Sequence, residues 1–197
     1  MKLRSILTKF KLKRYIRVNE TYMLDLRKLK LKKFGKIGIN VRISEKCEFY
    51  NSENLYLGNH LFIGRECYID AVSEIRIGDG TCIGPRVTMI SSNHNYDSNN
   101  LNTIPYDNYI IEKKIIIDEN VWIGAEVKIT PGSLICEGAV CAMGSVIRGH
   151  VDELSIVGGN PSKVIKYREN KELYFKLKSE SKQFNKVYRF KKCNNKL

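Results

Sequence analysis

A polar segment near the middle of the chain holds the residue best suited to acid–base chemistry. It reads SSNHNYDSNNLNTIPYDNYIIEKK and places His94 among asparagines, aspartates and tyrosines. The pKa of an imidazole lies near neutral pH, so His94 can take a proton from a hydroxyl group and make the oxygen a nucleophile. A lone histidine in a polar loop is more often an ordinary surface residue. The surrounding elements must therefore decide between a base and a surface residue.

A six-residue repeat flanks this segment on both sides. The second position of each hexad is often glycine, and the fifth is mostly small or β-branched. The first position is apolar in Ile37, Ile43, Phe49, Leu57, Ile63, Ile69, Ile77, Ile83, Met89, Ile117, Ile123, Ile129, Ile135, Cys141 and Ile147. A period of six fits neither a helix nor an isolated strand. It predicts short strands joined by corners, with three hexads closing a triangular coil that is stabilised by its stacked neighbours.

The spacing of the coils shows where the polar segment belongs. Triplets of hexads start at residues 37, 57 and 77, then at 117 and 135. The step from 77 to 117 is about twice the others, which predicts a loop inserted at about residues 91–116. A loop that projects from a rigid solenoid is a common place for binding and catalysis. His94 lies in this loop, and from the residues alone it can be a base or a surface residue.

The pattern [LIV]-[GAED]-x-x-[STAV]-x resembles that of the hexapeptide-repeat acyltransferases over about residues 37–168. The segments NVWIGA (120–125) and SIVGGNPSKVI (155–165) resemble those of galactoside, maltose and xenobiotic O-acetyltransferases, and of capsule or lipopolysaccharide sugar O-acetyltransferases. The resemblance implies an all-β fold, a left-handed parallel β-helix of about five coils. It also implies acetyl-CoA as acyl donor, no metal, and direct O-acetylation of a sugar or polysaccharide hydroxyl with His94 as general base.

The resemblance further implies where the coenzyme binds. The positions that match the family's coenzyme contacts are Trp122, Ala125, Met143, Gly144, Arg148, Lys163 and Lys166. Met143 stands where the family often has alanine, and Arg148-Gly149 where it often has Thr-Lys. Active sites between the subunits of a homotrimer are also implied.

The acceptor-binding residues are expected within the loop itself. They are Asn93, Tyr96, Asp97 and Tyr106, because tyrosines can stack on sugar faces and Asn or Asp can bond to hydroxyls. Asp97 is also a candidate to orient His94. His60 and His150 fall at fourth positions of hexads, where outer faces without a partner are expected. Three scattered histidines argue against the convergent set that a metal-dependent carbonic anhydrase of this fold needs.

The net charge of +13 is concentrated at the two ends of the chain. Residues 1–42 carry fourteen Lys or Arg against two acids, and residues 163–197 carry twelve against three. Residues 43–162 carry eight against sixteen. A neutral-to-acidic body argues against nucleic-acid binding, whereas the basic ends suit an anionic polymer or peripheral membrane association. No stretch reads as a membrane span or a signal peptide, so a cytoplasmic location is expected, with the inner face of the membrane as an option.

Three parts of the chain follow from these patterns: a basic N-terminal cap (1–36), the β-helix (37–168) and a basic C-terminal helix and tail (169–197). Residues 1–20 read as an amphipathic helix that caps the first coil or lies on a membrane. The C-terminal helix is expected to pack onto the last coil. Two alternatives to O-acetylation stay open, namely an amino-sugar N-acetyltransferase of the same fold and a non-catalytic scaffold.

Overall fold

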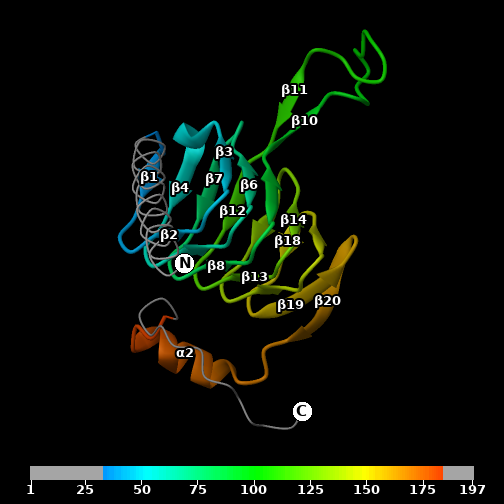
Figure 1. The fold of residues 1–197 in the computed structure, drawn as a ribbon. Coiled ribbons are helices and arrows are strands. Elements are labelled where there is room, and N and C mark those ends of the chain that lie inside the picture. Colours follow the sequence, from blue (N-terminus) through cyan, green and yellow to red (C-terminus); the bar gives the residue numbers. More distant parts are fainter. Residues whose placement is uncertain (1–32, 184–197) are drawn as a thin grey trace, which may run out of the picture. The chain divides into compact units, whose positions relative to one another are not determined.

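Short stacked strands dominate the computed structural model, which describes residues 33–183 (Figure 1). The chain divides into two compact units, residues 1–34 and residues 35–197. The β-helix and the site described below both belong to the second unit. The predicted N-terminal cap, apart from its last residues, and the tail after residue 183 lie outside the described residues.

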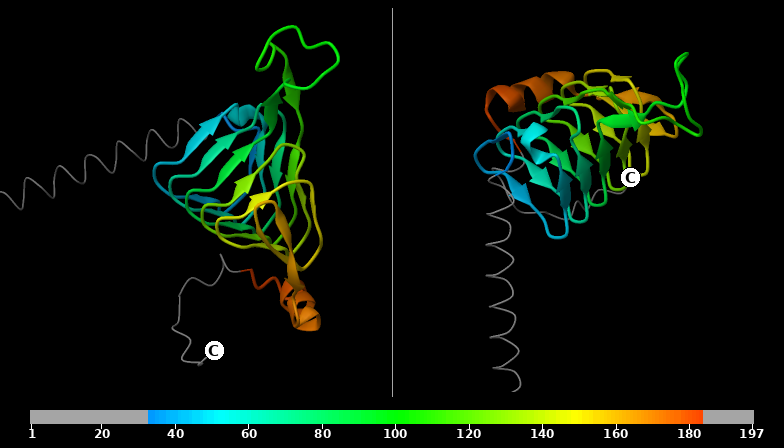
Figure 2. Two further views of the ribbon diagram at one scale, coloured as in Figure 1. Left: turned by 90° about the vertical axis from the view of Figure 1, so that its right-hand side faces the viewer. Right: turned by 90° about the horizontal axis from the view of Figure 1, so that it is seen from above.

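Three parallel sheets form the sides of the β-helix, and each complete coil adds one strand to each sheet. Sheet A contains β1 (Lys36–Ile37), β4 (Leu55–Leu57), β7 (Ile75–Ile77), β12 (Ile115–Ile117), β15 (Leu134–Ile135) and β18 (His150–Val151). Sheet B contains β2 (Arg42–Ile43), β5 (Phe62–Ile63), β8 (Cys82–Ile83), β13 (Trp122–Ile123), β16 (Val140–Cys141), β19 (Ser155–Gly159) and β20 (Ser162–Tyr167). Sheet C contains β3 (Glu48–Tyr50), β6 (Tyr68–Asp70), β9 (Thr88–Ile90), β14 (Lys128–Ile129) and β17 (Val146–Ile147). Viewed along the stack, the coils outline a triangle (Figure 2).

The apolar first positions of the hexads stack in register and form the core. Ile77 pairs with Ile117, and Met89 pairs with Ile129 across the inserted segment. From the second coil onward the first positions are at most 2% exposed, and each such aliphatic side chain contributes roughly 1.5–3 kcal/mol by its burial. The predicted coils are confirmed: five are complete, and β18 and β19 begin a sixth.

The corners explain the glycines at second positions. A Cβ on Gly124 would lie 2.7 Å from the backbone nitrogen of Met143 in the next coil, so only glycine fits there. Thr81, at a fifth position, is fully buried, and its hydroxyl donates to the Asp118 carbonyl at 3.0 Å. The Thr81 hydroxyl oxygen also accepts a hydrogen bond from the Val121 backbone N–H at 3.2 Å. The corners thus approach closely without leaving this buried hydroxyl unsatisfied.

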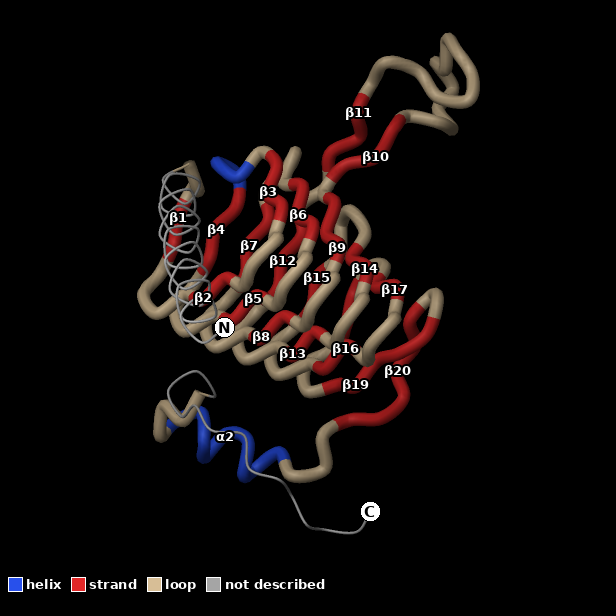
Figure 3. Tube along the Cα trace, in the orientation of Figure 1, coloured by secondary structure: helices blue, strands red, loops and turns tan. Residues whose placement is uncertain are grey.

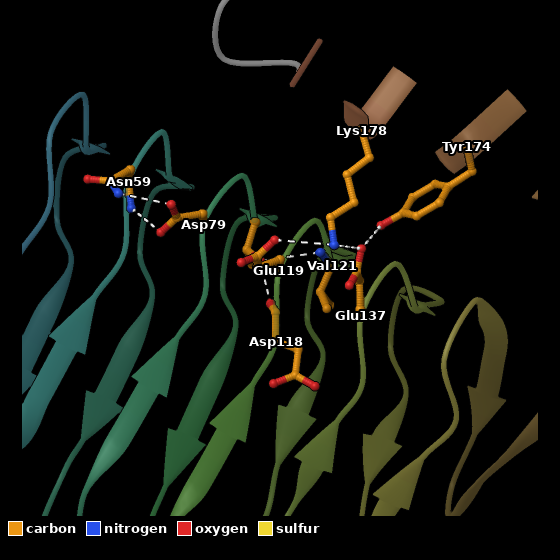
Figure 4. A network of polar contacts seen from close by, with 9 residues as sticks. Asn59, Asp79, Asp118, Glu119, Val121, Glu137, Tyr174 and Lys178 are labelled. Atoms are coloured by element: carbon orange, nitrogen blue, oxygen red, sulfur yellow. Dashed lines mark hydrogen bonds and ion pairs between the residues drawn. The ribbon is translucent and has the colours of Figure 1, made fainter. Parts of the chain in front are cut away.

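The C-terminal helix contacts the fifth complete coil, as expected, but it also contacts the fourth. Strand β20 turns back antiparallel on β19, and the chain then enters α2 (Lys171–Ser179). Helix α2 contacts the corner between sheets A and B, where it lies next to the fourth and fifth coils (Figure 4). The antiparallel return of β20 makes this possible, since it redirects the chain along the side of the stack.

Polar contacts with this acidic corner hold α2 in place, because none of its residues is buried. The Lys178 ammonium lies 2.5 Å from the carboxylate of Glu137 and 3.5 Å from that of Glu119. The Tyr174 hydroxyl donates to Glu137 at 3.2 Å. Partial burial and the neighbouring Glu137 charge raise the pKa of Tyr174, and the bond to Glu137 raises the pKa of Lys178. Within residues 33–183, no helix has the length and hydropathy of a membrane span.

Candidate active site

The predicted insertion forms an arm that projects from the β-helix between the third and fourth coils (Figure 3). Its base is a hairpin of β10 (Ser92–His94) and β11 (Ile110–Glu112), paired antiparallel with His94 opposite Ile110. His94 therefore lies at the outer end of the hairpin, where the arm opens into a longer loop.

Charged residues fix the base of the arm. Glu74 lies 2.8 Å from Arg76 and 3.3 Å from Lys114, which follows β11. The Ile115 backbone N–H also donates to the Glu74 carbonyl at 3.0 Å. The hydrogen bond from Arg76, followed by that from Lys114, lowers the pKa of Glu74 to about 2. Glu74 thus ties the returning chain to sheet A.

The imidazole of His94 is exposed and is oriented by stacking. Its ring lies 3.9 Å from the Tyr106 ring, centroid to centroid, at an interplanar angle of 16°. The His94 backbone N–H donates to Oδ1 of Asn93 at 2.9 Å. Among residues 33–183, no hydrogen bond reaches either ring nitrogen of His94, so both are free to exchange protons with a substrate. Tyr106, a predicted acceptor residue, contacts the candidate base.

A buried polar pair closes the loop just beyond His94. Asn95 Nδ2 donates to Asp107 Oδ2 at 2.7 Å and to the Ser98 hydroxyl at 2.9 Å, and the Tyr109 N–H donates to Asp107 Oδ1 at 2.9 Å. Asn95 and Asp107 are only 8% and 3% exposed. Sequence reasoning missed Asp107, because a single aspartate in a polar segment carries no signal that sets it apart.

A pocket of about 440 Å³ lies between the arm and the side of the β-helix. This arm pocket is lined by Asn93, Tyr96, Asp97, Ile111, Lys113, Thr130, Pro131 and Arg148. It brings together three of the four predicted acceptor residues and one predicted coenzyme residue, Arg148. Its volume lies in the range of small-molecule sites.

His94 does not line the arm pocket. Side chains alternate between the two faces of a strand, and Asn93 is paired with Ile111 while His94 is paired with Ile110. Asn93 and Ile111 therefore point to one face of the hairpin, which is the pocket, and His94 points to the other. The hairpin thus presents two faces with different chemistry.

Three of the predicted coenzyme residues share one corner, between sheets B and C. The Gly144 N–H donates to the Ala125 carbonyl at 2.8 Å, and the neighbouring Met143 side chain is 73% exposed. Lys163 and Lys166 lie on β20, and Lys166 pairs with Glu169 at 2.8 Å. Arg148 is apart from this group, in the arm pocket.

Trp122 lies on sheet B in a different groove, one of about 650 Å³ between the sheet and α2. The walls of this groove include Phe62, Cys82 and Leu177, with Arg168 and Lys178 among its charged residues. Trp122 lines this groove and His94 does not, and neither residue lines the arm pocket. One chain therefore does not bring all the predicted catalytic and coenzyme residues together.

The two other histidines occupy outer surfaces, as expected, but they do have partners. His60 Nδ1 lies 3.1 Å from Asn40 Nδ2, and His150 Nε2 lies 3.3 Å from Asp152 Oδ1 and 3.8 Å from the Cys136 sulfur. Stacked coils bring residues of neighbouring corners into contact, which the spacing of single residues did not reveal. Over residues 33–183, no group of three His, Cys, Asp or Glu is arranged to hold a metal ion.

Known acyltransferases are similar to this chain. It is 28% identical over 117 residues to a putative lipopolysaccharide biosynthesis O-acetyltransferase of Escherichia coli, covering 57% of the chain and 60% of that protein. It is 29% identical over 173 residues to the dTDP-4-amino-4,6-dideoxy-D-glucose acyltransferase of E. coli, covering 75% and 90%. For several curated relatives the match spans only 44 to 60% of their length.

A solved structure shares the fold. The hexapeptide-repeat acetyltransferase of Vibrio cholerae, crystallised with acetyl coenzyme A, has a TM-score of 0.66 and 26% identity, over 74% of this chain and 77% of that one. No protein-family model matches the chain. The repeat, the coiled fold and these relatives agree, and the chain is similar to the hexapeptide-repeat acyltransferases.

Proposed function

We propose that this protein transfers an acetyl group from acetyl-CoA to a hydroxyl of a sugar or polysaccharide. The observation that carries the proposal is His94, an exposed imidazole held by Tyr106 on an arm that projects from the coils. The relatives support the reaction class, since they include a galactoside O-acetyltransferase and a putative lipopolysaccharide biosynthesis O-acetyltransferase.

His94 acts as the general base in the proposed reaction. Acetyl-CoA supplies the acetyl group as a thioester whose thiolate leaves readily. A free ring nitrogen of His94 takes the proton of the acceptor hydroxyl as its oxygen forms the new ester bond and the carbon–sulfur bond breaks. The proton then passes to the thiolate, so the imidazole is restored and no covalent enzyme intermediate is needed. Backbone N–H groups stabilise the oxyanion.

The coenzyme-binding role of the seven predicted residues stays a proposal. Coenzyme A needs cations for its phosphates and a slot with backbone polar groups for its pantetheine arm. Exposed Met143 and Gly144 offer backbone at a corner, and Lys163 and Lys166 offer positive charge on β20. These features fit the coenzyme, while the position of Arg148 beside the arm suggests a different partner.

We further propose a homotrimer whose active sites form between subunits. The separation of His94 from Trp122 within one chain supports this, because a neighbouring copy can supply the missing half. Sedimentation equilibrium of the full chain should give three times the mass of the 22.7 kDa monomer. A monomer that is fully active contradicts this part of the proposal.

A cytoplasmic location, with the basic ends touching the inner face of the membrane, is also proposed. The concentration of Lys and Arg in residues 1–42 and 163–197 supports it. Sedimentation with anionic liposomes tests the membrane contact, which should weaken with added salt.

Coenzyme A release over a panel of sugars, amino sugars and polysaccharides tests the reaction. His94→Ala should lower kcat by about 10²-fold or more with the affinity for acetyl-CoA retained. His150→Ala is the matched control, since it removes an exposed histidine outside the proposed site. Unchanged turnover in His94→Ala refutes the assignment. Preference for an amine acceptor favours the N-acetyltransferase, and no binding of acetyl-CoA favours a scaffold.

A further inference from the structure

The arm pocket contains two cations: Lys113, which the proposed reaction does not use, and Arg148, which lies apart from the other predicted coenzyme residues. Residues 43–162 hold only eight Lys or Arg against sixteen acids, yet Lys113 and Arg148 line this one pocket. Neither side chain has an ion-pair partner within residues 33–183. Asp97 is the pocket's acidic residue, so the lining carries a net positive charge inside an otherwise acidic body.

The backbone and stem of Lys113 are held in place. Its backbone N–H donates to the Ser91 carbonyl at 2.9 Å. Its aliphatic stem lies against Gly132, where an added Cβ would be only 3.3 Å from the Lys113 Cδ. Gly132 has a φ of +83°, which favours glycine. The bare glycine therefore makes room for the lysine stem beside the pocket.

The remaining polar groups of the pocket suit a carbohydrate. Asn93 uses its Oδ1 to accept from the His94 backbone, which leaves its amide N–H₂ to donate. Thr130 donates its hydroxyl to the Ile147 carbonyl at 3.0 Å, which leaves its oxygen to accept. The Tyr96 side chain is 57% exposed and offers a ring face. Such a mixture of donors, acceptors and one aromatic ring fits hydroxyl groups and the apolar face of a sugar.

We propose that the arm pocket binds a sugar unit that carries an anionic group. Lys113 and Arg148 bind the anion, Asp97 accepts from a hydroxyl, and Tyr96 stacks on the ring. Binding itself does not depend on acetyl transfer. The role of the arm pocket as an acceptor subsite rests on the proposed function. Because the pocket lies on the hairpin face opposite His94, it would hold the glycan unit next to the one that is acetylated.

Calorimetric titration of the full chain, without coenzyme and at low salt, tests the proposal. D-glucuronate serves as the acidic probe and D-glucose as its neutral match. We expect glucuronate to bind about tenfold more tightly than glucose, or better, and to weaken as salt is added. Lys113→Met and Arg148→Met should each reduce glucuronate binding about tenfold. Lys46→Met removes the same charge from an exposed position outside both pockets and should have no effect.

Several outcomes overturn the inference. They are equal binding of glucose and glucuronate, no binding of either, and glucuronate binding that survives both substitutions. Saturating coenzyme A tests the other source of an anion: if it displaces glucuronate, or inorganic phosphate binds more tightly than glucuronate, the cations belong to the coenzyme phosphates. The wild-type comparison of two sugars needs no variant that could misfold. His94→Ala should bind glucuronate normally, so a failure of acetyl transfer and a failure of this site are distinguishable.

Discussion

Removing the Asp107 carboxylate should loosen the arm and displace His94 without unfolding the β-helix. Asp107 accepts two hydrogen bonds, from Asn95 Nδ2 at 2.7 Å and from the Tyr109 N–H at 2.9 Å, in a site where Asp107 is 3% exposed. A hydrogen bond to a charged group contributes about 1.5–3 kcal/mol. Asp107→Ala therefore removes roughly 3–6 kcal/mol from the ordered loop and leaves a buried amide without its carboxylate partner.

The rest of the arm can compensate only in part. The hairpin β10–β11 has three residue pairs, and the Asn95 and Asp107 backbone N–H groups keep bonds of 3.2 and 3.0 Å to the carbonyls of Tyr109 and Asn95. Because each 1.36 kcal/mol is a factor of ten, we expect kcat/KM to fall by about 10²-fold. Asp107→Asn keeps one acceptor oxygen and should fall between the wild type and Asp107→Ala.

Hydrogen exchange read by mass spectrometry separates the arm from the coils. In Asp107→Ala, amides within residues 91–116 should exchange much faster, while those of the buried strands keep their protection. The unfolding temperature of the β-helix should change little, because Asp107 lies outside the stacked core. Wild-type exchange in the arm together with wild-type kcat/KM would show that the buried pair does not order the loop.

Two further substitutions test the electrostatic contacts. Glu137→Gln removes the carboxylate that binds Lys178, at a cost of about 1 kcal/mol because both groups are partly exposed. Limited proteolysis should therefore cut near α2 faster while the coils stay intact. An unchanged rate of cleavage speaks against the contact. The pKa of Glu74 is lowered in the folded protein to about 2 from 4.5. Its stabilising effect is complete above pH 4.5 and lost as the pH falls toward 2. Thermal unfolding should therefore show a smaller acid-induced loss in Glu74→Gln than in the wild type, and equal losses contradict the role of Arg76 as its partner.

The sequence alone predicted the stacked coils, because the six-residue repeat is a local pattern. A hexad places an aliphatic side chain inside and a corner outside whatever its neighbours are, so the first positions from Leu57 to Ile147 identified the core and the coils. The break in the repeat located the arm and His94 within it. These features depend on spacing along the chain, which a single sequence displays.

Only the tertiary structure decided which loop residues meet and which face each one occupies. Asn93 and His94 are neighbours in sequence but point to opposite faces, because antiparallel pairing makes the segment a strand. Asp107 meets Asn95 twelve residues away. Arg148, which follows β17 in the fifth coil, lines the arm pocket although the arm leaves the β-helix after the third coil. Helix α2 contacts an acidic corner of the fourth coil as well as the fifth. Each outcome depends on contacts between distant segments, and no local pattern records those contacts before the chain has folded.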